Sequence, residues 1–377
     1  MLNQQIDMMR AAAPRLDVFA EILRTTWREI ADSGNLAPEF QSHRFNGTDE
    51  DRAAGISWIG ERIAPSPTLD RIMVTNGTMN SILLLSSSIV GPGGVILTEE
   101  LTFPIAYTLT DIAGAQVKPV KIDSIGMIPD DFERKCKEFK PKAVYVNCTV
   151  HSPTAYITPT DRREQIAEIA RHYGVQILED EAQALYVLRA PKSFASIAPD
   201  ITWYMMGLSK YLSLGIRMAY VVAPSAKALN RVLDRLRPVT TWHAAPIIAN
   251  IVTRWIEIGR AQEILRASRA EVHRRQKVAS ELLGDLEGFR GSSGIHFWLK
   301  APRGVLSTDF SKAIGDAGVI VRPSRLYSGT AEPRLQGVRP GIGEPRSIEE
   351  THQALEIIRE VYRVMEGRNG ISGAKTR

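Results

Sequence analysis

Residues 204–217, YMMGLSKYLSLGIR, begin as the apolar run of a buried strand and continue into a glycine-containing turn that carries Lys210. Arg217 follows, and the chain is apolar again at 218–222. An ammonium group between two buried strands is costly unless it is paired or neutralised, and burial lowers the pKa of a lysine, which makes the amine nucleophilic toward a carbonyl. We therefore hypothesise that Lys210 forms a Schiff base with an aldehyde cofactor. The alternative is a solvated lysine at the end of a strand.

The composition is that of an ordinary globular protein that is long enough for two domains. Of its 377 residues, 44% are hydrophobic and 24% are charged. The 47 lysines and arginines are scattered among 42 acidic residues, and the net charge of +5 weakly favours anionic ligands without indicating nucleic acid. Cys136 and Cys148 form no metal-binding or disulfide pattern, which favours a reducing cytoplasm. Because the sequence shows no signal peptide and no apolar run of membrane-spanning length, we expect a cytoplasmic protein without membrane contact.

Strand and helix patterns alternate between residues 72 and 222, which is typical of a parallel sheet with crossover helices. Thr158 is the expected cap of one of these helices, with Pro159 at its first position. Residues 225–283 predict two or three long helices, and a smaller α+β unit with a closing helix at 348–365 follows. The expected strands are 72–74, 95–97, 117–120, 143–146 and 175–178, and the expected earlier helices are 17–32, 52–63, 78–90, 105–113, 130–139 and 159–173.

Ligands of open α/β sheets collect at the carboxyl ends of the strands, and candidate binding residues follow the first two expected strands. Gly77, Thr78 and Met79 open a helix directly after the first strand, where free backbone N–H groups suit a phosphate; a plain Asn-Gly turn is the alternative. After the second strand, Phe103 is fixed by a following proline and could stack on a planar ring, or could simply belong to the core.

Two further strand ends carry polar groups. The loop 147–155 contains several hydrogen-bond donors, among them Ser152, while its lone His151 is interpreted as structural. The three carboxylates at 179–181 would raise one another's pKa, so a nearby cation is expected; no metal-binding spacing accompanies them, and no metal is predicted. The planar guanidinium of Arg217 suits a phosphate. A phosphate cradle, an aromatic ring, a carboxylate, a lysine and this arginine are together the groups needed to hold pyridoxal 5′-phosphate.

In this order and spacing the residues resemble the fold type I aminotransferases (class I/II) that use pyridoxal phosphate. The resemblance is strongest to the aminotransferase-like domain of the MocR-type regulators and to the 2-aminoadipate aminotransferase-like enzymes. It runs from about residue 40 to the closing helix and rests on ELTFP (100–104), ILEDE (177–181), GLSK (207–210) and GIR (215–217).

The resemblance implies the fold and the assembly. The fold would be α/β, with a large domain built on a mostly parallel seven-stranded sheet and a smaller α+β domain. The implied division is an N-terminal segment at 1–44 that packs with the small domain, the large cofactor-binding domain at 45–260 and the small C-terminal domain at 261–377. A homodimer is implied as well.

The resemblance also implies a role for each matching residue. Lys210 would carry the cofactor as an internal aldimine and, once freed by substrate, would move the proton between the substrate's Cα and the cofactor. Asp180 would pair with the pyridine nitrogen and keep it protonated, and Arg339 in LQGVR (335–339) would grip the substrate's α-carboxylate. The remaining implied cofactor contacts are Gly77, Thr78, Ser209 and Arg217 at the phosphate, Phe103 on the ring face, and Met79, Ser152 and Gln183 elsewhere around the cofactor.

Four positions depart from the family pattern. Ser152 replaces an asparagine, Gln183 a tyrosine and Gly207 a serine, while Phe40 replaces a tyrosine that reaches the neighbouring subunit's phosphate. The expected function is an aminotransferase that moves an amino group between an L-amino acid and a 2-oxo acid through the Lys210 aldimine. Since the asparagine and tyrosine normally bond the cofactor's phenolic oxygen, two alternatives are kept. One is an enzyme of the same fold that catalyses elimination, replacement or oxidation of an amino acid in a specialised pathway, and the other is a catalytically altered pyridoxal-phosphate sensor.

The expected partners are small molecules. MocR-type regulators carry a winged helix-turn-helix ahead of this domain, but only about 45 residues precede the match here and they contain no basic recognition helix, so no nucleic-acid partner is expected. The substrate's side chain is expected near the N-terminal segment, the region of Trp242 and His243, and the loop 322–327. The two arginines of this loop either favour an acidic side chain or are simply solvated.

Overall fold

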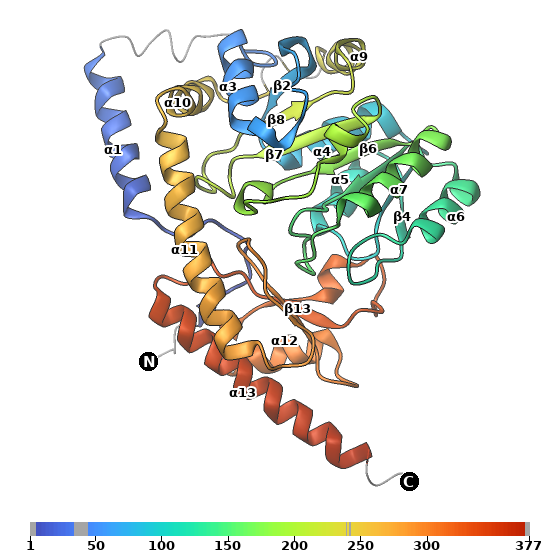
Figure 1. Cartoon of the computed structure of the whole chain (residues 1–377), viewed down its shortest axis with the longest axis vertical. Coiled ribbons are helices and arrows are strands. Elements are labelled where there is room, and N and C mark those ends of the chain that lie inside the picture. The colour runs from blue at the N-terminus through green and yellow to red at the C-terminus, as the bar shows by residue number, and fades with distance from the viewer. Residues whose placement is uncertain (1–4, 34–43, 239, 241–242, 374–377) are drawn as a thin grey trace.

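The computed structural model describes residues 5–33, 44–238, 240 and 243–373. A large twisted sheet covered by helices occupies one end of the molecule, and a smaller sheet with its own helices occupies the other (Figure 1). The long helix α11 (Arg260–Leu283) runs from the first part into the second. Within the described ranges, no helix combines the length and the apolarity that a membrane span needs.

The large sheet has seven strands and is parallel apart from one strand, which confirms the predicted architecture. Strands β6 and β7 are buried at almost every position, as expected for strands covered on both faces. The exception is β8, which runs antiparallel between its neighbours β7 and β2. In spatial order the strands are β2 (Ile72–Thr75), β8 (Ala219–Val222), β7 (Thr202–Gly207), β6 (Gln176–Asp180), β5 (Ala143–Val146), β3 (Val95–Glu99) and β4 (Gln116–Val120).

The antiparallel strand explains the position of the segment 204–217. Because β8 returns beside β7, the connection 208–218 forms a loop that turns back at the carboxyl end of β7. Leu208 N donates to Met218 O at 3.0 Å and closes the base of this loop. Lys210 and Arg217 therefore emerge together at the sheet edge where the parallel strands end.

The helices around the large sheet agree with the predicted alternation, with differences at their ends. The capping box of Thr48 and Asp51 starts α3 ahead of the predicted position. The predicted helix 78–90 is α-helical only as far as Leu85 and continues as one π-helical turn, Ser86–Val90. The helices are α3 (Asp49–Ile59), α4 (Thr78–Leu85), α5 (Pro104–Ile112), α6 (Pro129–Phe139), α7 (Thr160–His172), α8 (Phe194–Ile197), α9 (Ala226–Leu236) and α10 (Pro246–Glu257).

The predicted cap of α7 is wrong. Pro159 occupies the N-cap position without a side-chain hydrogen bond, and the buried Thr158 Oγ1 has no partner. Thr158 is held by tertiary contacts instead, because its N–H donates to Cys148 O at 2.9 Å and its carbonyl accepts from Arg163 Nε at 2.9 Å.

The smaller part combines two sheets with helices. An antiparallel sheet has the spatial order β12 (Arg322–Pro323), β13 (Gly337–Arg339), β10 (Trp298–Lys300) and β9 (Phe289–Arg290). Strand β1 (Ile6–Asp7) pairs with β11 (Val319–Ile320), so the N-terminal segment joins this part of the molecule. The accompanying helices are α1 (Asp17–Asp32), which contacts α11, α12 (Ser307–Asp316) and α13 (Ile348–Gly373).

Apolar clusters bury both faces of the large sheet. One includes Trp58 and Tyr204 and extends without interruption to Phe297 and Leu355 in the smaller part. The opposite face packs Met205 against the helices that cover it. Because both faces are packed, the strand ends form a fixed platform for the side chains that follow them.

Candidate active site

A cavity of about 300 Å³ lies at the carboxyl edge of the large sheet. Its walls come from the residues that follow β2, β3, β5, β6 and β7, and from β12 and β13 of the smaller part. It brings together every predicted site residue except Gly77, which lies against the Arg217 side chain but does not line the cavity. The predicted residues in its lining are Thr78, Met79, Phe103, Ser152, Asp180, Gln183, Ser209, Lys210, Arg217 and Arg339.

Lys210 is held at the cavity wall by a backbone carbonyl. Its Nζ donates to Ala11 O at 2.8 Å, and the turn that carries it is fixed by Ser209 Oγ, which donates to Ile216 O at 2.7 Å. Burial, aided by the charge of Arg339 and opposed by Asp180, lowers the pKa of Lys210 to about 8. A fraction of the amine is therefore neutral near pH 7, as a nucleophile or base must be.

Asp180 is the carboxylate of this cavity. It ends β6 and is buried, and its Oδ2 accepts from Tyr145 Oη at 2.8 Å while Oδ1 accepts from Ala182 N at 3.1 Å. Burial raises the pKa of Asp180 to about 6, and the phenol of Tyr145 opposes this. Asn147 fixes the backbone here, because its Nδ2 donates to Asp180 O at 2.7 Å.

Sequence reasoning missed Tyr145 and Asn147, which both line the cavity. They stand two positions apart at the end of β5, where alternate residues project from the same face of a sheet. That two-residue spacing of polar side chains at a strand end was the available signal.

An anion cradle forms where β2 ends. Gly77 precedes α4 with φ of +83°, which glycine adopts without strain, and the first N–H groups of the helix are left free for a ligand. A Cβ at Gly77 would lie 3.4 Å from Arg217 Nη2, so the guanidinium lies directly against this turn. Arg217 Nη2 also approaches Met79 Sδ at 3.8 Å, and no carboxylate pairs with it among the described residues.

The packing around Gly207 explains why glycine stands where the family resemblance predicts a serine. A Cβ built at Gly207 would lie under 3.0 Å from Thr78 Oγ1, closer than real Cβ atoms come. The hydroxyl of Thr78 therefore occupies the space that a serine side chain at position 207 would need.

Arg339 is buried on the side of the cavity formed by the smaller sheet. Its Nε donates to Tyr327 Oη at 2.7 Å and its Nη2 donates to Met9 O at 2.7 Å. Its Nη1 is buried and has no hydrogen-bond partner. One nitrogen of the guanidinium is thus free for an anion, and Tyr327 and the N-terminal segment bind the other two nitrogens.

Three other predicted residues have protein partners of their own. Phe103 is half-buried and packs against the core on one side of the sheet. Ser152 N donates to Asn147 Oδ1 at 2.9 Å. Gln183 Oε1 accepts from Ile295 N at 3.0 Å, and its Nε2 contacts His296 Nδ1 at 3.2 Å. Phe40, the fourth departure from the family pattern, and Trp242 lie outside the described residues.

The predicted cation beside the carboxylates 179–181 is confirmed. Arg163 Nη1 lies 3.6 Å from an oxygen of both Glu179 and Glu181, and the half-buried Arg62 pairs with Glu181 at 2.7 Å; none of the four lines the cavity. Burial and the neighbouring Glu181 raise the pKa of Glu179 to about 7. Across the described part of the chain, no three His, Cys, Asp or Glu side chains are grouped so that they could hold a metal ion.

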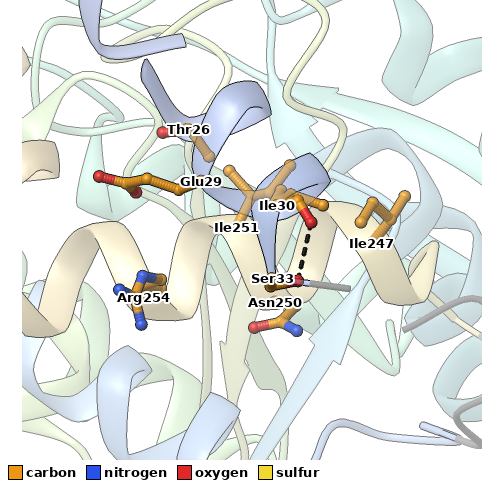
Figure 2. A pocket seen from close by; sticks show the side chains of 8 residues that line it. All are labelled: Thr26, Glu29, Ile30, Ser33, Ile247, Asn250, Ile251 and Arg254. Atoms are coloured by element: carbon orange, nitrogen blue, oxygen red, sulfur yellow. Dashed lines mark hydrogen bonds between the residues drawn. The ribbon is translucent and has the colours of Figure 1, made fainter. Parts of the chain in front are cut away.

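A second cavity of about 210 Å³ lies between α1 and α10 (Figure 2). Its one carboxylate among the described lining residues, Glu29, already accepts from Arg260 Nη2 at 2.6 Å. Ser33 Oγ donates to Ile30 O at 2.7 Å at its edge. Since this cavity has no paired nucleophile and acid among those residues, we assign the candidate active site to the first cavity.

Comparison with known proteins adds relatives of the same fold. The chain is 26% identical over 297 residues to the uncharacterized HTH-type transcriptional regulator YdeF of Bacillus subtilis, which covers 78% of this chain and 63% of the regulator. It is 23% identical over 304 residues to the 2-aminoadipate transaminase of Thermus thermophilus, with coverage of 78% and 74%. The solved structure of a multiple substrate aminotransferase from Thermococcus profundus has a TM-score of 0.85 at 19% identity, over 98% of this chain and 93% of that one.

The match to a family is the more decisive finding. The chain spans about three fifths of the length of the curated regulators it matches. Residues 20–335 match the family model for aminotransferase class I and II, which is well over half of the chain. This protein therefore belongs to the aminotransferase class I and II family.

Proposed function

We propose that this protein is a pyridoxal-phosphate-dependent aminotransferase that moves an amino group between an L-amino acid and a 2-oxo acid. The observation that carries the proposal is the presence of Lys210 and Asp180 in one cavity with Arg217 and Arg339. An amine that attacks a carbonyl, a carboxylate for a protonated ring nitrogen and two separate anion sites are what this chemistry requires.

The side chains of the cavity fit pyridoxal phosphate. The turn at Gly77 and the cation of Arg217 suit a phosphate, and the buried carboxylate of Asp180 suits a ring nitrogen that carries a proton. In this proposal Gly77, Thr78, Met79, Ser209 and Arg217 hold the phosphate end, Asp180 holds the ring nitrogen, and Phe103, Ser152 and Gln183 surround the ring.

The proposed reaction assigns a task to each polar group. When bound, pyridoxal phosphate supplies a ring that accepts the electron pair released from the substrate's Cα–H bond. Lys210 Nζ removes and returns the proton at Cα, because its lowered pKa leaves neutral amine available. Arg339 clamps the α-carboxylate through its free Nη1 and so orients the Cα–H bond.

A second candidate is supported by Gln183. Both polar atoms of its side-chain amide have protein partners, so the position of the family tyrosine offers no phenol to a ligand. Loss of that contact favours a different outcome after Cα–H cleavage, namely elimination, replacement or oxidation, or a sensor that binds the cofactor without turnover.

Product analysis separates these candidates. The cofactor-loaded protein is incubated with a panel of amino acids and 2-oxoglutarate, and 2-oxo acids, glutamate and ammonia are measured. Release of the matching 2-oxo acid together with glutamate supports amino transfer, release of ammonia supports elimination or oxidation, and binding without either product supports a sensor. The proposal fails if the protein binds no pyridoxal phosphate, or if Lys210→Ala leaves the visible absorption of the bound cofactor unchanged.

The proposal extends to assembly and location. It keeps the division into an N-terminal segment at 1–44, a cofactor-binding domain at 45–260 and a small domain at 261–377, which agrees with the separation of the seven-stranded sheet from the two smaller sheets. It also includes a homodimer in the cytoplasm, and the free, buried state of both cysteines agrees with a reducing compartment. Light scattering of the purified protein tests the homodimer.

A further inference from the structure

Two arginines face each other in the wall of the cavity. Arg322 on β12 is the direct partner of Arg339 on β13 in the antiparallel register. Directly opposite side chains project from the same face of a sheet, with Cα atoms roughly 4.5–5.5 Å apart, and like charges at such positions destabilise the pair. Both side chains line the cavity, so this repulsion acts in the space that a ligand would occupy.

Each of the two guanidinium groups has a nitrogen without a hydrogen-bond partner in the protein. Arg339 Nη1 and Arg322 Nε are buried without a hydrogen-bond partner, and within the described residues neither arginine forms an ion pair. By contrast, the buried Arg163 and the half-buried Arg62 both lie against the carboxylate of Glu181. Because a buried donor without an acceptor is costly, the unpaired arginines indicate that an anion belongs between them.

The charge balance of the cavity supports the same conclusion. In the proposed function, the cofactor's phosphate matches Arg217 and the substrate's α-carboxylate matches Arg339. Arg322 is then left without an anion at a half-buried position. Among the described residues that line the cavity, Asp180 is the one carboxylate, against the cationic side chains of Arg10, Lys210, Arg217, Arg322 and Arg339.

Arg322 also lies close to the reacting centre. Burial is the main reason that the pKa of Lys210 is lowered, and the positive charges of Arg339 and Arg322 add to the effect. A carboxylate bound to Arg322 would therefore lie within reach of the same small molecule that Arg339 holds.

We infer that Arg322 binds a second carboxylate of the substrate, so that this protein acts on short dicarboxylic amino acids and the matching dicarboxylic 2-oxo acids. This inference rests on the proposed function for the reaction, whereas binding of a dicarboxylate can be measured independently. An arginine holds a carboxylate through two parallel hydrogen bonds, and a substrate with a neutral side chain leaves that buried donor set unpaired.

Arg322→Met is compared with Arg325→Met as a matched control. Arg325 lies in the adjacent turn Ser324–Tyr327 but does not line the cavity. Calorimetry measures the binding of glutarate and of pentanoate, which differ by one carboxylate. The parent protein should bind glutarate at least about 10-fold more tightly than pentanoate, and this preference should be lost in Arg322→Met and kept in Arg325→Met. Arg322→Lys keeps the positive charge but not the planar guanidinium, and it should keep part of the preference for glutarate.

Turnover gives a second readout. The ratio of kcat/KM for glutamate to that for norvaline should fall roughly 30- to 100-fold in Arg322→Met. The inference is overturned if the parent shows no preference for glutarate, or if the variants at 322 and 325 change both ratios alike. Amino transfer without preference for acids would overturn it while leaving the proposed function intact. Selective dicarboxylate binding that depends on Arg322, in a protein that transfers no amino group, would support it and overturn the proposed function.

Discussion

Replacing Gly207 by serine, the residue that the family carries at this position, is expected to destabilise this protein. A Cβ at position 207 would lie under 3.0 Å from Thr78 Oγ1, whereas the distance to Thr78 Cβ would be an ordinary 3.7 Å. Relief requires the Thr78 side chain to rotate or the strand to shift, and overpacking of this kind costs about 1–3 kcal/mol. Thr78→Ala removes the crowding hydroxyl, so the double variant should regain most of the lost free energy of unfolding.

Urea denaturation of the parent, the two single variants and the double variant measures the coupling between the two positions. We expect a favourable coupling of about 1–2 kcal/mol, as found for side chains in direct contact. Gly215→Ser in the same turn is the control, because nothing lies within 4 Å of a Cβ built there, and it should change stability by less than about 0.5 kcal/mol. The steric explanation is refuted if Gly207→Ser is as stable as the parent, or if Thr78→Ala does not rescue it.

Three other outcomes are expected. Arg163→Met removes the cation between Glu179 and Glu181 and should lower the free energy of unfolding by roughly 3–5 kcal/mol in urea, since the buried Glu179 loses its cation and Glu181 keeps only Arg62; parent-like stability would contradict the role of this ion cluster. The rate of pyridoxal phosphate uptake by the ligand-free protein should rise with pH through about 8, because Lys210 is protonated below its lowered pKa and nucleophilic above it; a flat profile between about pH 7 and 9 in stopped-flow absorbance would count against this assignment. Asp180→Asn should slow amino transfer at least about 100-fold in single-turnover measurements while cofactor uptake through Lys210 persists, and a parent-like rate would remove Asp180 from the proposed mechanism.

The sequence predicted the alternating elements well because the buried strands are short apolar runs and the crossover helices carry their own signals. The predicted helix 78–90 ends where expected but changes from α to π geometry after Leu85, whereas the predicted cap at Thr158 was wrong. The backbone N–H of Thr158 is bonded to Cys148 and its carbonyl accepts from Arg163 in α7, while the Oγ1 that a cap would use has no partner. The local pattern gives no information on the contact with Cys148.

The part of the candidate site that lies at the carboxyl ends of the strands was predictable, because ligands of open α/β sheets bind there. Asp180 ends β6, Lys210 and Arg217 lie in the connection after β7, and all three meet in one cavity. Tyr145 lies within a strand, where an aromatic residue is normally interpreted as core. The carbonyls of Met9 and Ala11, which accept from Arg339 and Lys210, had no signal at all, because a backbone acceptor leaves no trace in the identity of its residue.

The contacts of those two carbonyls join residues that the ribosome adds at very different times. Ala11 and Lys210 are 199 positions apart, and Met9 and Arg339 are 330 positions apart. At roughly 5–20 residues per second, the ribosome needs roughly 20–70 s to add the second partner of the longer pair. Until then, the segment around Met9 lacks the side-chain donor of Arg339. The contact between Met9 and Arg339 therefore forms only after nearly the whole chain has been made.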